Sequence, residues 1–344
     1  MIALPTDAQN EDTPEAPAAA PEAAAEADAV DHSFQEITDG LDKAVEKGLA
    51  YLAKQQNEDG SFDAPRYGGS HVGVTAICCL AFLANGELPG RGDYGHVVQK
   101  GLDYIIANAQ ESGLIASENV SHGPMYGHGF ATLFLAEVYG MTDDDDVRDA
   151  LVKAVRLIVK SQNPEGGWRY QPIPYDADLS VTICQVKALR SARQAGIDVP
   201  KETIENAIQY VKDCQNPYDG GFRYMVHGGS SAFPRSAAGV ASLYYAGVYK
   251  GDEINEGLTY IERQIAVGND EGGHDFYGHY YCSQAMFIAG GKHWAAYFPM
   301  IRERLIGRQQ RDGSWDSGHG DEYATGMSLI ILQMPYRLLP IIQR

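Results

Sequence analysis

The fold is decided by a recurring segment whose clearest copy reads Gln162-Asn163-Pro164-Glu165-Gly166-Gly167-Trp168. Three further copies are clear: Gln55-Gln56-Asn57-Glu58-Asp59-Gly60-Ser61-Phe62, Gln215-Asn216-Pro217-Tyr218-Asp219-Gly220-Gly221-Phe222 and Gln310-Arg311-Asp312-Gly313-Ser314-Trp315. Two copies are degraded: Gln110-Glu111-Ser112-Gly113-Leu114 and Asn269-Asp270-Glu271-Gly272-Gly273-His274. The marker glycines, 60, 113, 167, 221, 273 and 313, are almost evenly spaced, with a shorter last interval. This regularity predicts an architecture of repeated units.

Two kinds of helix flank each marker. The helix before it is amphipathic, with apolar residues on one face only. In the first repeat these residues recur at helical spacing: Ile37, Leu41, Val45, Leu49 and Leu52. The helix after it is apolar on nearly every face, as in residues 74–83 and 236–243. A helix of this second kind should be buried on every side.

Six buried helices need a surrounding layer. We therefore predict an all-α fold, an α/α toroid of six inner and six outer helices spanning residues 33–344. An open stack of helical hairpins is the alternative. The last inner helix, around residues 327–332, is as apolar as the others, whereas an open stack would end in a polar capping repeat. This favours a closed ring.

Composition narrows the class of protein. Lys plus Arg is 27 and Asp plus Glu is 46, which gives a net charge of −19 and argues against nucleic acid or an anionic membrane as partner. No stretch is long and apolar enough to predict a transmembrane helix. Residues 1–32 are rich in Ala, Pro and acidic residues and are expected to be a disordered linker. They lack signal-peptide features, so we expect a cytoplasmic protein, or an exported one if a signal peptide has been removed.

The Gln-x-x-x-Gly-x-Trp/Phe markers between alternating helices resemble the repeats of squalene–hopene cyclases and protein prenyltransferase β-subunits. The resemblance covers the whole body of the chain and implies the toroid fold. In such repeats we expect the marker to be structural, its Gln capping the preceding helix and its aromatic residue packing between neighbours. A prenyltransferase β-subunit would also imply a protein partner, which the sequence does not identify.

The catalytic motifs of these families are only partly present. Where bacterial squalene cyclases carry an Asp-x-Asp-Asp acid motif, this chain has Asp176 and Asp178, followed by Leu179 instead of the last Asp. Where prenyltransferase β-subunits place Asp, Cys and His around zinc, the matching residues are Tyr277, His279 and Ala324. The resemblance therefore does not predict that zinc site.

Ionisable residues recur at one place in the repeat. We aligned the inner helices on a small residue, namely Thr75, Thr132, Thr182, Gly239, Ser283 and Gly326. One helical turn earlier stand His71, His128, Asp178, Arg235, His279 and Glu322. Because one turn keeps residues on the same face, we predict that these six surround a shared cavity. Inter-helix hydrogen bonding is an alternative role, and a divalent metal near His71, His128 and Asp178 is a minority alternative to a site without cofactors.

The predicted cavity would combine an anion-binding mouth with an aromatic interior. Arg235, the histidines and the helix N-termini would attract an anionic group. Tyrosines such as Tyr280 and Tyr323 would stabilise a carbocation. Asp176 and Asp178 are the candidate general acids, although for one of the two we expect helix capping rather than acid catalysis.

Three functions follow from these features. The first is a terpenoid cyclase-like or prenyltransferase-like protein that binds or transforms an isoprenoid or other hydrophobic small molecule. The second is a noncatalytic toroid that binds a ligand or a protein partner. The third is an enzyme acting on a glycan, which would need two carboxylates about 5–10 Å apart. It is disfavoured because Asp178 and Glu322 are expected to lie farther apart than this and because the inner helices are apolar.

Overall fold

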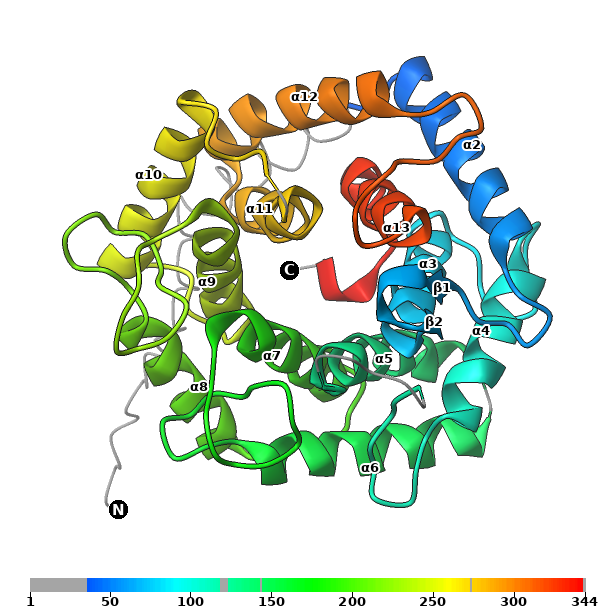
Figure 1. Cartoon of the computed structure of the whole chain (residues 1–344), viewed down its shortest axis with the longest axis horizontal. Helices are drawn as coiled ribbons and strands as arrows, with labels where there is room; N and C mark the ends of the chain where they lie inside the picture. Colours follow the sequence, from blue (N-terminus) through cyan, green and yellow to red (C-terminus); the bar gives the residue numbers. More distant parts are fainter. Residues whose placement is uncertain (1–35, 118–122, 143, 273, 343–344) are drawn as a thin grey trace, which may run out of the picture.

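The computed structural model describes residues 36–117, 123–142, 144–272 and 274–342. The predicted tail, residues 1–32, lies outside them. The described helices form two concentric rings (Figure 1). The inner ring contains α3 (Val72–Ala84), α5 (Met125–Val138), α7 (Leu179–Gln194), α9 (Phe233–Tyr245), α11 (Asp275–Ala289) and α13 (Asp321–Leu332). The outer ring contains α2 (Asp39–Gln55), α4 (Gly95–Ala107), α6 (Asp145–Ser161), α8 (Lys201–Asp213), α10 (Asp252–Ala266) and α12 (Gly291–Arg308).

The smaller elements lie in the connections. Strands β1 (Asp63–Ala64) and β2 (Gly69–Ser70) pair antiparallel, with Asp63 opposite Ser70 and Ala64 opposite Gly69. Four short 3₁₀ helices complete the described structure: η1 (Pro65–Tyr67), η2 (Tyr139–Met141), η3 (Met334–Tyr336) and η4 (Pro340–Ile342). No helix of the described ranges combines the length and the apolar character that crossing a membrane requires.

The ring is closed, as the sequence predicted. Each inner helix packs on the next, and α13 packs on α3. At this junction, a Cβ added to Gly326 would lie 2.8 Å from a methyl carbon of Ile77, so only glycine allows the two helices to pack this closely. The side-chain amide of Gln333 also donates to the carbonyl of Ala81 across the same junction.

The marker segments join consecutive repeats. Four glutamines, Gln56, Gln162, Gln215 and Gln309, each donate to a carbonyl within their own marker and to a carbonyl of the next outer helix. Gln309 reaches Ala44 of α2 and so ties the last repeat to the first. As predicted, Gln56, Gln162 and Gln309 are the C-cap residues of the preceding helices α2, α6 and α12, and their side chains in addition contact the following outer helix. The expected aromatic packing is seen, because Trp168 and Trp315 are buried and their indoles donate to carbonyls of α6 and α12.

The marker glycines are needed for their backbone conformation. Gly60 has a φ of +88°, and a Cβ there would collide with the carbonyl of Lys100 in the next outer helix. In the third marker the residue with positive φ is Gly166, at +98°, rather than Gly167. Such positions favour glycine over every residue that has a side chain.

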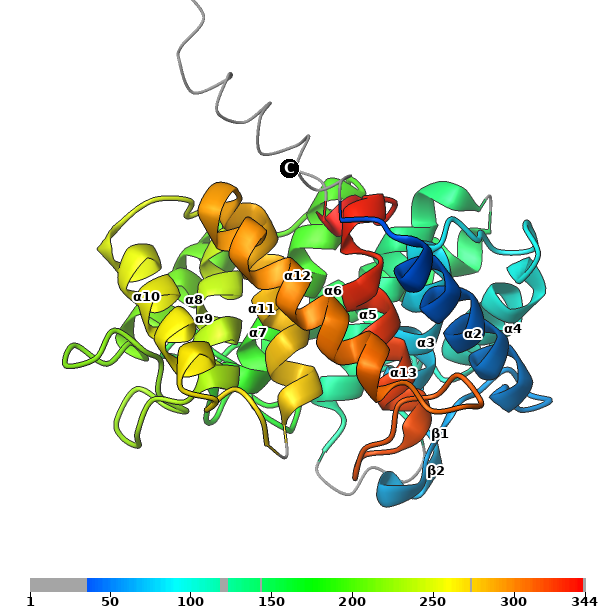
Figure 2. The same ribbon diagram turned by 90° about the horizontal axis from the view of Figure 1, so that it is seen from above.

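The two ends of the ring differ. The loops that carry the markers and the β1–β2 hairpin lie at the end where the inner helices begin, which we call the mouth. The C-terminal segment, residues 333–342, crosses the centre of the ring at the opposite end, which we call the closed end (Figures 1 and 2). Leu339 and Ile341 of this segment are buried.

Candidate functional site

A cavity of about 580 Å³ lies at the mouth, among the first turns of the inner helices and the loops that precede them. Its aromatic lining consists of Tyr67, Tyr126, Phe130, Tyr170, Tyr224, Tyr277 and Tyr323. Its charged or imidazole lining consists of Arg66, His71, Arg235, His274 and His319. None of the described lining residues carries a carboxylate. The cavity is therefore aromatic and rich in hydrogen-bond donors.

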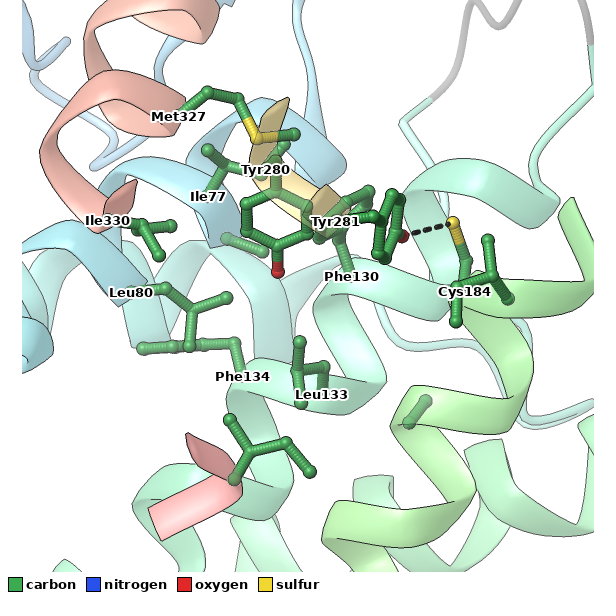
Figure 3. Close-up of a cluster of buried hydrophobic side chains, with 14 of the residues drawn as sticks. Ile77, Leu80, Phe130, Leu133, Phe134, Cys184, Tyr280, Tyr281, Met327 and Ile330 are labelled. Atoms are coloured by element: carbon green, nitrogen blue, oxygen red, sulfur yellow. Dashed lines mark hydrogen bonds between the residues drawn. The ribbon is translucent and has the colours of Figure 1, made fainter. Parts of the chain in front are cut away.

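The cavity does not continue through the ring. Ile77, Phe130 and Met327 line its floor. Below them the centre is filled by Tyr280, Tyr281 and other large apolar side chains (Figure 3). The rings of Phe130 and Tyr280 pack with their centroids 5.9 Å apart. The predicted cavity therefore lies at the mouth, and bulky side chains occupy the space inside the inner ring below it.

The structure does not bring the six aligned residues to one cavity. His71 and Arg235 line it. Asp178 and Glu322 lie near the mouth but not among the described lining residues. His128 and His279 are buried within the protein, away from the cavity.

The alignment on small residues explains the difference. In four repeats a hydroxyl near the start of the inner helix accepts a hydrogen bond from the N–H of the marker aromatic residue; these hydroxyls belong to Thr75, Thr182, Ser236 and Thr325. His128 performs the same task, because its Nδ1 accepts from the N–H of Ile115 at 3.1 Å. It is therefore equivalent to Thr75, not to His71 one turn earlier. Burial lowers the pKa of His128 to about 4, which fits a neutral structural residue.

His279 belongs to a buried network between α11 and α12. Its Nδ1 lies 3.0 Å from the hydroxyl of Tyr297, and its Nε2 lies 3.4 Å from a carboxylate oxygen of Asp270. Arg304 donates to the same Asp270 oxygen at 2.7 Å. This network links an inner helix to the layer outside it and has no access to the cavity.

His71 presents a hydrogen-bond donor to the cavity. Its Nδ1 caps α3 by accepting from the N–H groups of Gly73 and Val74, at 3.1 and 3.4 Å. Burial lowers the pKa of His71 to about 4, so the ring is neutral near pH 7. Because Nδ1 is an acceptor, the proton of the neutral ring is on Nε2.

Arg235 brings a positive charge to the same space. Its Nη2 donates to the carbonyl of Ser230 at 3.0 Å, while its Nε has no hydrogen-bond partner among the described residues. It sits in the first turn of α9, and no side chain caps that helix. Uncapped N–H groups and a guanidinium together favour an anionic ligand group.

Asp178 is buried behind the tyrosines of the cavity. Its Oδ1 accepts from the N–H of Val181 at 2.9 Å, which is the predicted capping role for α7. Burial raises the pKa of Asp178 to about 6, against the opposing effects of that bond, of Tyr224 and of Arg169. Its Oδ2 lies 3.6 Å from Arg169 Nε. Asp178 can thus hold a proton in mildly acidic solution, but Tyr224, rather than Asp178 itself, faces the cavity.

Of the other predicted site residues, one lines the cavity and three do not. Asp176 is partly exposed and forms an ion pair with Arg169. Tyr323 lines the cavity, whereas the hydroxyl of Tyr280 points toward the closed end and accepts from Lys187 at 2.6 Å. Glu322 is half-buried, and its backbone carbonyl accepts from the thiol of Cys78. Burial raises the pKa of the Glu322 carboxyl.

Several lining residues were not predicted from the sequence. Tyr67, Tyr170, Tyr224, His274 and His319 come from the loops that precede the inner helices. The loops differ in length between repeats, so aligning the helices gave no information about them. Their high content of Tyr and His near Gly and Pro was the only available signal.

The model of one protein family, the prenyltransferase alpha-alpha toroid domain, matches residues 27–111 and 103–278. The chain belongs to this family. No curated protein matches the chain in sequence.

Solved structures share the fold of this toroid at low sequence identity. The GH76A α-1,6-mannanase from Salegentibacter sp. HEL1_6 is 12% identical, with a TM-score of 0.65, over 87% of this chain and 99% of the other. The type II terpene cyclase MstE from Scytonema is 15% identical, with a TM-score of 0.61, over 88% and 99%. A protein from Actinoplanes is 15% identical, with a TM-score of 0.55, over 87% and 99%. These likenesses show the fold alone.

The metal alternative finds no support in this prenyltransferase-type toroid. Of the three residues considered, His71 and Asp178 cap different helices, and His128 bonds the backbone of Ile115. Nowhere in the described ranges do three His, Cys, Asp or Glu side chains come together as metal ligands would. Tyr277, at the position matched to a zinc-binding Asp, instead donates its hydroxyl to the carbonyl of Ser180 at 3.1 Å.

Proposed function

We propose that this protein binds, in the mouth cavity, an isoprenoid-type ligand with an apolar body and an anionic end group. The volume of about 580 Å³ lies within the range of small-molecule sites. The floor of Ile77, Phe130 and Met327 suits the apolar body. The tyrosines around it offer both ring faces and hydroxyl groups to the rest of the ligand.

One observation carries the anionic part of the proposal: the described lining has two arginines and three histidines but no carboxylate. No side chain caps α5, α9, α11 or α13, whose N-termini surround the cavity. Helix N-termini and guanidinium groups both stabilise negative charge. A carboxylate or a phosphate on the ligand would find donors here in the guanidinium groups of Arg66 and Arg235.

Solved structures with this fold hold ligands of two different classes. The terpene cyclase MstE, which has this fold, was solved with its substrate geranylgeranyl dihydroxybenzoate. The mannanase with the same fold was solved with α-1,6-mannotriose. Glycoside hydrolysis needs two carboxylates beside the substrate, and the described cavity lining offers none. The lining therefore favours the isoprenoid class over a glycan.

Binding and turnover are separate parts of the proposal. As a general acid, Asp178 would have to act through Tyr224, and Asp176 is engaged by Arg169. A noncatalytic binding protein is the second candidate, favoured by the distance of these carboxylates from the cavity. Product analysis after incubation with prenyl substrates separates the two candidates, since a noncatalytic protein returns its ligand unchanged.

Calorimetric titration of the full chain tests the binding. The probes are geranyl diphosphate, farnesyl diphosphate, farnesoic acid, farnesol and inorganic pyrophosphate. We expect the amphipathic anions to bind more tightly than farnesol or pyrophosphate. Arg235→Gln should weaken the anions about tenfold or more, because a charge-assisted hydrogen bond contributes about 1.5–3 kcal/mol. Arg311→Gln, at an exposed marker residue, is the matched control. Binding by no probe, or equal binding of farnesol and farnesoic acid, would refute the proposal.

A further inference from the structure

Tyr67 and His319 meet at the mouth although they belong to the first and last repeats. The hydroxyl of Tyr67 lies 2.6 Å from Nδ1 of His319. The two rings are nearly parallel, with an interplanar angle of 9° and centroids 5.9 Å apart. Both side chains line the cavity.

Other titratable groups surround the pair. The ring of His274, just before α11, stacks on His319 at 5.7 Å, and Tyr323 of α13 meets it edge-on at 5.6 Å. His71, just before α3, lies 5.9 Å from the ring of Tyr67. Arg66 precedes Tyr67 in η1 and also lines the cavity. The pair is therefore fixed among aromatic and basic side chains, and burial raises the pKa of Tyr67.

A group that transfers a proton to a ligand must come within hydrogen-bond reach of it. The described carboxylates nearest the mouth do not line the cavity, whereas Tyr67 and His319 do. We propose that Tyr67 and His319 form a proton-transfer pair that acts on the ligand in the mouth cavity. This inference rests on the proposed function, since it names the reacting groups of the same site.

The proton transfers balance in both directions. With His319 as an imidazolium, Nδ1–H donates to the Tyr67 oxygen. The O–H bond of Tyr67 then breaks as its proton passes to the ligand, and the Nδ1 proton moves to the phenol oxygen. With His319 neutral, the reverse sequence removes a proton from the ligand through Tyr67 to Nδ1. No metal, cofactor or second substrate is consumed.

The acidity of a phenol limits the reaction class. An ordinary tyrosine has a pKa near 10, so it is far too weak to protonate an alkene. It can protonate an oxygen that becomes negatively charged, or exchange a proton on carbon next to a carbonyl group. The pair therefore indicates chemistry at the oxygen-bearing end of the ligand rather than acid-initiated cyclisation of its hydrocarbon chain.

The first experiment follows the histidine Cε1–H resonances of the full chain by NMR between pH 5 and 9. The His319 signal is assigned by its loss in His319→Asn. Tyr67→Phe keeps the ring but removes the hydroxyl, and it should move the His319 titration midpoint by about half a pH unit or more. Tyr218→Phe, whose side chain is 95% exposed, should leave it unchanged. An unchanged midpoint in Tyr67→Phe would overturn the inference.

The second experiment counts protons on binding. Geranyl diphosphate is titrated calorimetrically in two buffers of different ionisation enthalpy, with the wild type, Tyr67→Phe, His319→Asn and His227→Asn. Wild type should take up or release up to about one proton on binding, and both pair variants should lose this exchange. His227→Asn, at an exposed site, should retain it. Binding with the same proton count in all four proteins would refute the pair alone. Loss of binding to every probe of the earlier panel would refute the proposed function instead.

Discussion

The mouth and the closed end of the toroid both contain polar side chains, but the surroundings of these side chains differ. At the closed end, the buried amine of Lys187 donates to the Tyr280 hydroxyl at 2.6 Å and to Gln284 Oε1 at 2.5 Å. Glu137 accepts from Ser191 and from the N–H of Ile341 in the C-terminal segment. At the mouth, Arg66 and Arg235 bring guanidinium groups to the lining of an open cavity.

The difference indicates where function is to be sought. Lys187 and Glu137 at the closed end are engaged by protein partners, and neither residue lines the described cavity. Their removal should change the stability of the fold and leave ligand binding intact. Polar groups that line the cavity, such as Arg235, should behave in the opposite way. Three substitutions test this contrast.

The largest effect is expected for Lys187→Met. Burial lowers the pKa of Lys187 from 10.5 to about 7, so between these values the unfolded chain holds a proton that the folded chain lacks. The free energy of unfolding of the wild type therefore rises with pH in this window, by about 1.4 kcal/mol per pH unit. The variant lacks this pH dependence. The difference in the free energy of unfolding between wild type and Lys187→Met should therefore change by about 3 kcal/mol from pH 7 to 9.

Urea unfolding at pH 6, 7, 8 and 9 measures this difference. Below pH 7 the difference should level off, because both states of the wild type are then protonated. Lys201→Met, at an exposed lysine, is the matched control and should show no such trend. If the difference between wild type and Lys187→Met did not change with pH, the Lys187 amine would be hydrated, and water would have access to the closed end.

A smaller effect of opposite sign is expected near the mouth for Asp178→Asn. Burial raises the pKa of Asp178 from 3.8 to about 6, so between these values the folded chain holds a proton that the unfolded chain releases. The wild type therefore loses stability as pH rises from 4 to 6. Asparagine can still cap α7 through its side-chain oxygen, and it does not titrate. Relative to the variant, the wild type should lose about 2 kcal/mol over this range.

The same urea series at pH 4, 5, 6 and 7 measures the Asp178 effect. His71 and His128, whose pKa values burial lowers to about 4, titrate in both proteins, so their contributions cancel in the difference. If the difference in the free energy of unfolding between wild type and Asp178→Asn did not change with pH, Asp178 would be ionised at pH 4. Its proposed role as a proton source would then be wrong.

The sequence predicted the architecture well, because apolar periodicity and the marker segments depend on local residue order. It predicted the site only in part. His71, Arg235 and Tyr323 line the cavity, but His128 was placed one turn out of register, and His279 lies in a buried network away from the cavity. In five repeats the equivalent residue is the one that bonds the marker backbone, and residue size does not reveal it. The Tyr67–His319 contact joins two loops outside the repeat pattern, so no periodicity predicts it.

The smallest effect is expected for Tyr280→Phe, which tests the boundary between the two ends. The ring of Tyr280 packs under the cavity floor against Phe130, while its hydroxyl accepts from Lys187 at the closed end. Phenylalanine keeps the packing and removes one buried hydrogen bond, which should cost about 1 kcal/mol in urea unfolding. Affinity for geranyl diphosphate should stay at the wild-type value, because Tyr280 does not line the cavity. A severalfold loss of affinity without further loss of stability would instead restore Tyr280 as a ligand-binding residue. It would also mean that the Lys187 network is coupled to the mouth through the floor.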